Sequence, residues 1–190
     1  MQEDTLKKRL KKTAVISVIL FITSYTIFLL LWMIVKQYYG NSITSIATHA
    51  VTVIKDVDIE DILSEENTIL VSFVPQRHEA REIIEITINT NSYTFNAPLT
   101  FAIMAAFYPY MRRKRVYFEV LLILVAVHVL YVFSLQGTYV TDTMISLGYE
   151  RSSTLKAVFW EFLWQFVDNM VIRFEPFLLG AYIYFRKEHA

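Results

Sequence analysis

Residues 159–185 combine the hydrophobicity of a membrane-spanning segment with charged side chains that could carry chemistry. The segment is long enough to cross a bilayer, yet it contains Glu161, Asp168, Arg173 and Glu175. A charge at the centre of a membrane helix costs roughly 2.5 to 3.5 kcal/mol on insertion scales, so these groups need partners. A buried carboxylate could act as a general acid or base, whereas Arg173 could pair with a carboxylate on another helix.

The polar side chains of this segment share one side of a helix. At about 100° per residue they span an arc of about 160°, and the rest of the circumference is apolar. They are Glu161, Gln165, Asp168, Asn169, Arg173 and Glu175. One face is therefore expected to meet lipid, and the other to meet protein or water. Pro176 removes a helix hydrogen bond, so a kink is expected beside Arg173 and Glu175.

Two interpretations of this polar face remain open. In the first, it is a structural interface, and Arg173 fixes how the chain assembles with a membrane partner. In the second, it is the site of a membrane-embedded enzyme or small transporter, with His128 of an earlier apolar segment as a further member. His128 by itself is more typical of a hydrogen-bonded packing residue than of a ligand or proton relay.

Composition places the chain among membrane proteins. Hydrophobic residues make up 55% of the 190 residues, and the mean hydropathy is +0.39. The 18 basic and 18 acidic side chains balance, which gives no reason to expect a nucleic-acid partner. The sequence has no cysteine, which excludes disulfides, thiolate metal sites and a cysteine nucleophile. It also lacks the common soluble-enzyme and metal motifs, so no metal and no cofactor is expected.

Two basic clusters set the expected orientation of the chain. The first precedes the apolar run 13–35, which is read as a signal anchor rather than a cleaved signal peptide. The second follows the apolar stretch that begins at residue 97, and the positive-inside rule places both clusters in the cytoplasm. The topology-determining residues are Lys7, Lys8, Arg9, Lys11, Lys12, Arg112, Arg113, Lys114 and Arg115.

The predicted fold is a membrane α-helical protein with four transmembrane helices and both termini in the cytoplasm. A small α/β region, an amphipathic helix plus a β-hairpin, lies outside the cytoplasm between the first two helices. The predicted transmembrane helices are residues 13–35, 97–111, 116–135 and 165–185. The cytoplasmic segments are 1–12, 112–115 and 186–190, and the extracytoplasmic segments are 36–96 and 136–164, the latter a loop and an interfacial helix.

Smaller patterns complete this layout. Ala102, Ala105 and Ala106 form a small-residue patch that allows close helix packing. Glu119 is expected to pair with Arg115 or Arg112 at headgroup level. Breaks are expected at Gly137 and Gly148, with a short helix, TDTMISL, between them.

Residues 36–96 show both helical and strand periodicity. Apolar residues recur at helical spacing over residues 43–57, behind a cap at Asn41 or Ser42, and that face is expected to pack on the strands that follow rather than on the membrane. The acidic stretch 56–67 lacks the glycine and spacing of a calcium loop and is read as a solvated turn and short helix. The runs TILVSFV and EIIEITIN predict a hairpin, and residues 93–95 predict a third short strand.

The second half of the chain resembles a known family. A strand-rich segment running into YTFNAPLTFAIMAAFYP, a basic turn, one further span and a final helix ending RFEPFLLGAYIYF are similar to the small membrane proteins encoded beside bacterial exosortases, the H-type associated proteins in particular. The resemblance covers residues 93–185. It implies an accessory role beside a membrane enzyme that sorts proteins bearing a C-terminal transmembrane tail. It also implies that this chain is not that enzyme, since the enzyme depends on a cysteine nucleophile.

The sequence therefore predicts a non-catalytic accessory or assembly protein of the bacterial inner membrane. Its expected partners are membrane lipid and another integral membrane protein, an exosortase if the resemblance holds. The alternative is the membrane-embedded enzyme or small transporter described above. A third interpretation, an exported binding module anchored by the helices, would require residues 36–96 to fold and bind a ligand alone.

Overall fold

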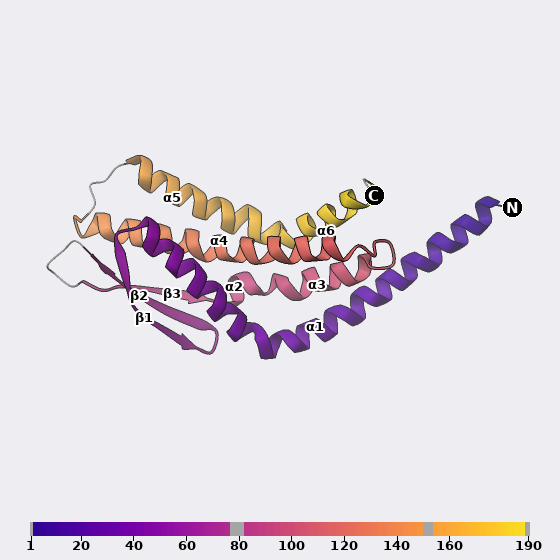
Figure 1. Ribbon diagram of the computed structural model, residues 1–190, viewed down its shortest axis with the longest axis horizontal. Helices are drawn as coiled ribbons and strands as arrows, with labels where there is room; N and C mark the ends of the chain where they lie inside the picture. The colour runs from indigo at the N-terminus through magenta and orange to yellow at the C-terminus, as the bar shows by residue number, and fades with distance from the viewer. Residues whose placement is uncertain (1, 77–81, 150–153, 189–190) are drawn as a thin grey trace. The chain divides into compact units, whose positions relative to one another are not determined.

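The computed structural model describes residues 2–76, 82–149 and 154–188, without the side chains of residues 2–10, 154, 187 and 188. The chain divides into two compact units. We call Met1–Val35, Phe95–Leu124 and Phe174–Ala190 the helical unit. We call Lys36–Thr94 and Val125–Arg173 the sheet unit. Figure 1 labels the α-helices and β-strands along the chain.

The first helix, α1 (Gln2–Ile54), is one long element that passes from the helical unit into the sheet unit. The predicted cap at Asn41 or Ser42 is therefore wrong, because the helix continues through both residues. Gly40 does not interrupt it. A side chain at Gly40 would lie 2.8 Å from the Thr90 side chain, so this glycine allows a close contact inside the helix.

Three antiparallel strands form the sheet, in the order β1 (Val57–Glu65), β2 (Thr68–Pro75) and β3 (Ile84–Asn89). The predicted hairpin is confirmed: β2 pairs with β3, and the isoleucines of β3 alternate with exposed polar residues. The acidic stretch forms β1 rather than a turn and short helix. Its charges are compatible with a strand because β1 lies at the sheet edge and faces mostly outward.

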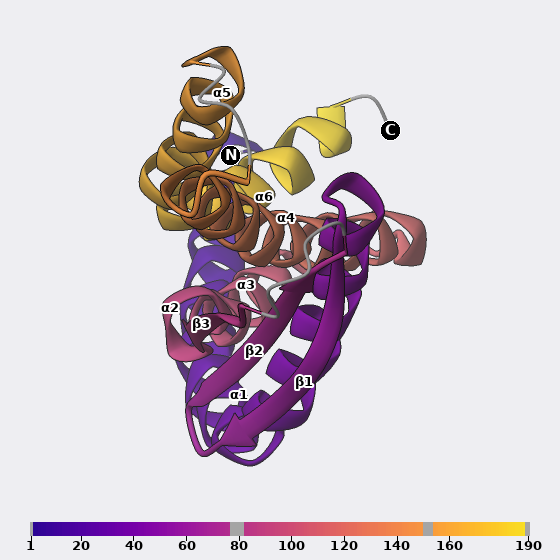
Figure 2. The same cartoon turned by 90° about the vertical axis from the view of Figure 1, so that its left-hand side faces the viewer.

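The sheet covers the second half of α1, as Figure 2 shows. Ile43, Ala47 and Val51 of α1 belong to one buried cluster with the inward-facing residues of β2 and β3. The expectation that this apolar helix face packs on the strands is therefore confirmed. The strand expected at residues 93–95 is not formed. A short helix, α2 (Asn91–Thr94), buries Tyr93 and Thr94 in its place.

Helix α3 (Asn96–Phe107) belongs to the helical unit and carries Pro98 in its first turn, where a proline costs no helix hydrogen bond. Helix α4 (Lys114–Ser146) runs on well past the predicted end of the third span at residue 135. Gly137 lies inside α4, so the break expected there is absent. Gly148 is the break, since it has a positive φ of 75° and ends the helical segment.

The last helical stretch contains a widened turn. Helix α5 (Thr154–Phe166) continues into a π-helical segment, η1 (Val167–Ile172), and then into α6 (Arg173–Glu188). Pro176 lies inside α6 and cannot donate a hydrogen bond to the carbonyl of Ile172, four residues earlier, which is the last residue of η1. The widened turn thus lies where the straight α-helical ladder is interrupted.

Each unit has its own core. In the helical unit, Ala97, Met111, Val116, Val120, Leu124, Leu179 and Ile183 are buried together. In the sheet unit, the core joins α1, the sheet, α4 and η1.

Among the described residues, two helices are long and apolar enough to cross a membrane, Lys11–Ile54 and Lys114–Ser146. All four predicted spans remain predictions, because this finding rests on helix length and composition alone. Helix α3 has only 12 residues, fewer than a bilayer-spanning helix needs.

Candidate functional site

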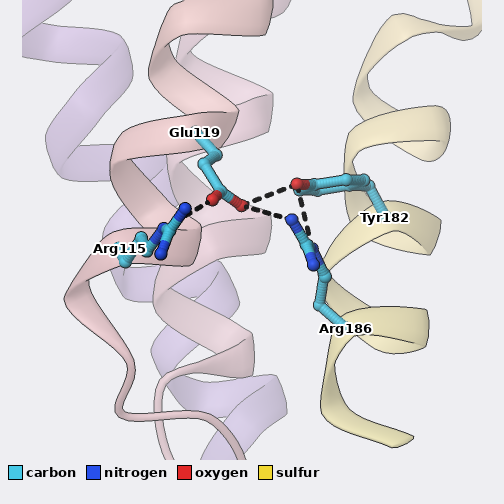
Figure 3. Close-up of polar contacts among 4 residues, drawn as sticks. All are labelled: Arg115, Glu119, Tyr182 and Arg186. Atoms are coloured by element: carbon cyan, nitrogen blue, oxygen red, sulfur yellow. Dashed lines mark hydrogen bonds and ion pairs between the residues drawn. The ribbon is translucent and has the colours of Figure 1, made fainter. Parts of the chain in front are cut away.

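A network around Glu119 joins the start of α4 to the end of α6 within the helical unit. Figure 3 shows the Glu119 carboxylate between Arg115 of its own helix and Tyr182 and Arg186 of α6. The Glu119 oxygens lie 3.1 Å from Arg115 Nε, 2.6 Å from Tyr182 Oη and 3.2 Å from Arg186 Nη2. We call these four residues the Glu119 cluster. The predicted pairing with Arg115 is confirmed.

Arg186 is held by both Tyr182 and Glu119. Its Nε donates to the Tyr182 hydroxyl at 3.1 Å, and the guanidinium lies 5.5 Å from the Tyr182 ring centroid. These contacts raise the pKa of Arg186 above its ordinary value, first through the Tyr182 hydroxyl and then through the Glu119 charge. The cluster is thus a fixed arrangement of positive charge around one carboxylate, suited to binding an anion.

A buried histidine defines the second polar cluster, in the sheet unit. His128 of α4 is 0% exposed, and its Nδ1 lies 2.7 Å from the Tyr39 hydroxyl of α1. The Tyr93 ring of α2 meets the imidazole edge to face at 5.7 Å between centroids. Among the alternatives for His128, this environment is that of a hydrogen-bonded packing residue.

Aromatic rings extend this cluster towards η1. Tyr131, one turn after His128, stacks at a tilt on Tyr93 and meets Trp164 of α5 at 5.0 Å between centroids. Its phenol is in hydrogen-bonding contact with the Asp168 carboxylate. Burial raises the pKa of Tyr93 to about 12, against the opposing effect of its hydrogen bond with Thr44. Tyr93 is therefore a neutral phenol at physiological pH.

Lys55 provides a buried cation in the same unit. It is 7% exposed, its Nζ donates to Thr141 Oγ1 at 2.6 Å, and it lies 4.8 Å from the Trp160 ring centroid. A second polar contact joins the same two helices, because Gln136 Nε2 of α4 donates to Thr48 Oγ1 of α1 at 2.8 Å. These contacts fix α1, α4 and α5 relative to one another within the sheet unit.

The polar side chains predicted to share one side of the last helical stretch differ in their exposure to solvent. Glu161, Gln165 and Arg173 are exposed, while Asp168 and Asn169 are half-buried. Arg173 Nη2 lies 3.9 Å from Asp168 Oδ2, a long and open ion pair worth little by itself. Asn169 donates to the Gln165 side chain at 3.0 Å. The straight α-helical phase behind the prediction does not hold, because η1 widens the helix between Gln165 and Arg173.

Glu175 belongs to the helical unit and is 1% exposed. The side-chain amide of Asn96, at the start of α3, donates to the Glu175 Oε2 atom at 3.3 Å.

Of the alanine patch, Ala102 is buried, whereas Ala105 and Ala106 are half-buried. A close approach of α6 to α3 occurs at Gly180, where an added Cβ would lie 3.2 Å from Ile103 Cγ2.

The basic residues predicted to set topology are exposed wherever their side chains are described: Lys11, Lys12, Arg112, Arg113, Lys114 and Arg115. Lys7, Lys8 and Arg9 have side chains outside the described set. Within the described residues, no group of three or more His, Asp or Glu side chains could hold a metal ion.

Sequence reasoning missed the tyrosines that belong to each cluster. The sequence pattern gives Tyr39 and Tyr182 no partner, and it predicts Tyr93 within a strand. The i,i+4 spacing of Tyr182 and Arg186 was an available signal for a polar pair at one helix end. No local pattern, however, indicates that Tyr39 lies beside His128, 89 residues later in the chain.

Comparison with known proteins places the chain in a family. The family model described as exosortase H-associated membrane protein matches residues 8–187. The chain belongs to the exosortase H-associated membrane protein family. The family resemblance is confirmed and extends beyond the predicted 93–185, since the match also covers α1 and the sheet. No match was found among the curated proteins or the solved structures.

Proposed function

We propose that this protein is a non-catalytic accessory subunit that assembles with an exosortase in the bacterial inner membrane. The observation that carries the proposal is the family match, which covers residues 8–187 and names an association with exosortase H. An accessory role also agrees with the absence of cysteine from the sequence, because the enzyme implied by the resemblance uses a cysteine nucleophile.

The exposed face of α5 and η1 supports a protein partner in the membrane. Aromatic and apolar side chains on this face are strongly exposed, with Phe162 at 65% and Met170 at 55%. Charged and polar side chains are exposed in the same stretch: Glu161 and Gln165 of α5, and Arg173 at the start of α6, whose side chain is 64% exposed. Lipid would solvate the apolar groups but not the charges. A partner helix with complementary polar groups would satisfy both.

Co-purification tests this assignment. The tagged protein is expressed with the exosortase of the same organism and purified in mild detergent, and the exosortase retained per tagged chain is quantified. We expect near-stoichiometric retention for the wild type. Arg173→Leu should weaken binding of the exosortase by about 30-fold or more, since removal of one partner of a desolvated charge pair costs about 2 kcal/mol or more of binding free energy.

Arg112→Leu is the matched control, because it makes the same change at an exposed arginine of the basic loop and should leave retention unchanged. No retention of exosortase by the wild type would sink the accessory role. An Arg173→Leu complex that stays intact but no longer supports sorting would favour the alternative, a catalytic or transport function of the charged side chains of this stretch.

A further inference from the structure

The Glu119 cluster borders a polar pocket that the accessory role does not use. The pocket has a volume of about 200 Å³ and is lined by Arg113, Arg115, Val116, Glu119 and Arg186. Three of these five residues are arginines, and one is a carboxylate. The lining therefore has an excess of positive charge, which favours an anionic occupant.

Glu119 orients the arginines without using up their donors. It accepts one hydrogen bond from Arg115 and one from Arg186, and the remaining described hydrogen bond of Arg186 goes to Tyr182. Within the described residues, these bonds use a minority of the N–H groups of two guanidiniums. The planar fork of an arginine matches the oxygens of either a carboxylate or a phosphate. A phosphate offers more acceptor oxygens than a carboxylate, so several arginines around one pocket suit a phosphate better.

An apolar groove lies in the same unit. It has a volume of about 430 Å³, and Leu20 and Phe28 of α1, Phe101 and Met104 of α3 and Tyr117 of α4 contribute to its lining. Tyr117 directly follows Val116, which lines the arginine pocket. The same turn of α4 therefore contributes Val116 to the lining of the arginine pocket and Tyr117 to the lining of the apolar groove.

We propose that the arginine pocket binds the phosphate of an anionic phospholipid, with an acyl chain of the same lipid in the apolar groove. The pocket supplies charge complementarity to the phosphate, and the groove supplies the apolar surface that free phosphate would not need. Arg115 and Val116 of the lining lie in the first turn of α4, and the positive end of that helix's dipole also favours an anion.

Lipid retention measured by native mass spectrometry tests the site. The delipidated full chain in neutral detergent is titrated with phosphatidylglycerol and with phosphatidylcholine in separate arms, and in a third arm inorganic phosphate is added to the phosphatidylglycerol complex. We expect phosphatidylglycerol to bind on the order of ten-fold more tightly than phosphatidylcholine. Inorganic phosphate at the same concentrations should not displace it. Equal binding of the two lipids, or displacement by inorganic phosphate at equal concentration, would overturn the proposal.

Variants separate this site from general electrostatic attraction. Arg115→Gln should weaken phosphatidylglycerol binding on the order of five-fold, and Arg115→Gln with Arg186→Gln on the order of 20-fold. Arg112→Gln changes the net charge equally outside the pocket lining and should change binding less than two-fold. Because the Arg115 side chain is 89% exposed, its single substitution should leave the fold intact. Equal losses in Arg112→Gln and Arg115→Gln would contradict a defined pocket.

Discussion

His128 is a polar residue in the middle of α4, and its surroundings explain how it is accommodated. The imidazole is fully buried among the rings of Tyr39 and Tyr93, and a 2.7 Å hydrogen bond joins it to the Tyr39 hydroxyl. A buried polar group that loses a hydrogen-bond partner costs the folded state its desolvation free energy. The Tyr39 hydroxyl is therefore expected to contribute to stability well beyond its size.

Tyr39→Phe tests this contribution. The substitution keeps the ring and removes the hydroxyl that meets His128 Nδ1, so we expect the free energy of unfolding to fall by about 1 to 2 kcal/mol. Chemical denaturation of the purified protein in detergent measures the change. Tyr38→Phe is the matched control, since Tyr38 is the preceding residue and is 76% exposed. The free energy of unfolding of Tyr38→Phe should lie within about 0.5 kcal/mol of that of the wild type. Equal effects of the two variants would refute the contribution of the Tyr39–His128 hydrogen bond.

Single residues differ in how far the sequence reveals their partners. The Glu119–Arg115 pair was predictable because the two residues are four apart on one helix. Tyr182 and Arg186 were not assigned to Glu119, because hydrophobic periodicity does not tell which helix end lies beside which. The same limit applies to Asp168, whose contact with Tyr131 depends on the packing of separate helices.

The contact between α4 and α5 depends on a glycine that the sequence pattern marks as a helix break. Gly137 lies in the middle of α4, and the Trp160 ring of α5 occupies the space where a Cβ would be. Trp160 also covers Lys55, and the Trp160 carbonyl accepts a hydrogen bond from Thr138 Oγ1 at 2.9 Å. Gly137 thus allows the close approach of the two helices.

Gly137→Ala should lower the free energy of unfolding by about 2 kcal/mol, because overpacking outweighs the gain in helix propensity. Thermal or chemical unfolding in detergent measures it. Gly180→Ala, the same substitution inside α6, meets its nearest neighbour at 3.2 Å and should change stability by less than about 1 kcal/mol.

Trp160→Leu should relieve the penalty of Gly137→Ala in the double variant, because the smaller side chain leaves room for the added methyl group. A Gly137→Ala variant as stable as the wild type would show that α4 and α5 do not pack this closely.

Elements were predictable where one physical pattern dominated. The alternation of isoleucine and polar residues identified β3, and the long apolar runs identified the apolar parts of α1 and α4. Strand β1 was missed because an edge strand needs few buried residues, so its acidic side chains resembled a solvated turn. The continuity of α1 was missed because a change from apolar to amphipathic composition does not require a break in the backbone.

At the scale of the whole molecule, orientation in the membrane is the main open expectation. The positive-inside rule predicts that residues 36–96 lie outside the cytoplasm and that the basic loop 112–115 lies inside. The cysteine-free sequence makes this directly measurable, because a single introduced cysteine has no competing thiol.

Glu60→Cys and Arg112→Cys provide the two reporters, since both positions are exposed. In spheroplasts treated with a membrane-impermeant maleimide, the Glu60→Cys protein should be labelled and the Arg112→Cys protein should be labelled only after the membrane is permeabilised. Detergent solubilisation is the control for thiol reactivity. Labelling of Arg112→Cys in intact spheroplasts would reverse the predicted orientation.

Membership of a membrane-protein family was also predictable at this scale, because it depends on composition and on the order of apolar and basic segments. The number of membrane spans was less predictable from the sequence. Helix α3 is about 18 Å long at 1.5 Å per residue, shorter than a bilayer core of about 30 Å. Whether residues 97–111 form one of the four predicted spans therefore depends on how the residues next to α3 lie in the membrane, which composition alone does not determine.

The π-helical turn η1 also marks a place where the chain can change its length. A π turn holds about one residue more than an α turn, so an inserted residue can be taken up there without rotating the α-helices on either side. Residues 167–172 are therefore where a family member could gain or lose one residue with the least disturbance to α5 and α6. We expect a sequence alignment of the family to place a one-residue gap inside this segment, with the residues from Arg173 onward keeping equivalent structural positions while their numbers shift.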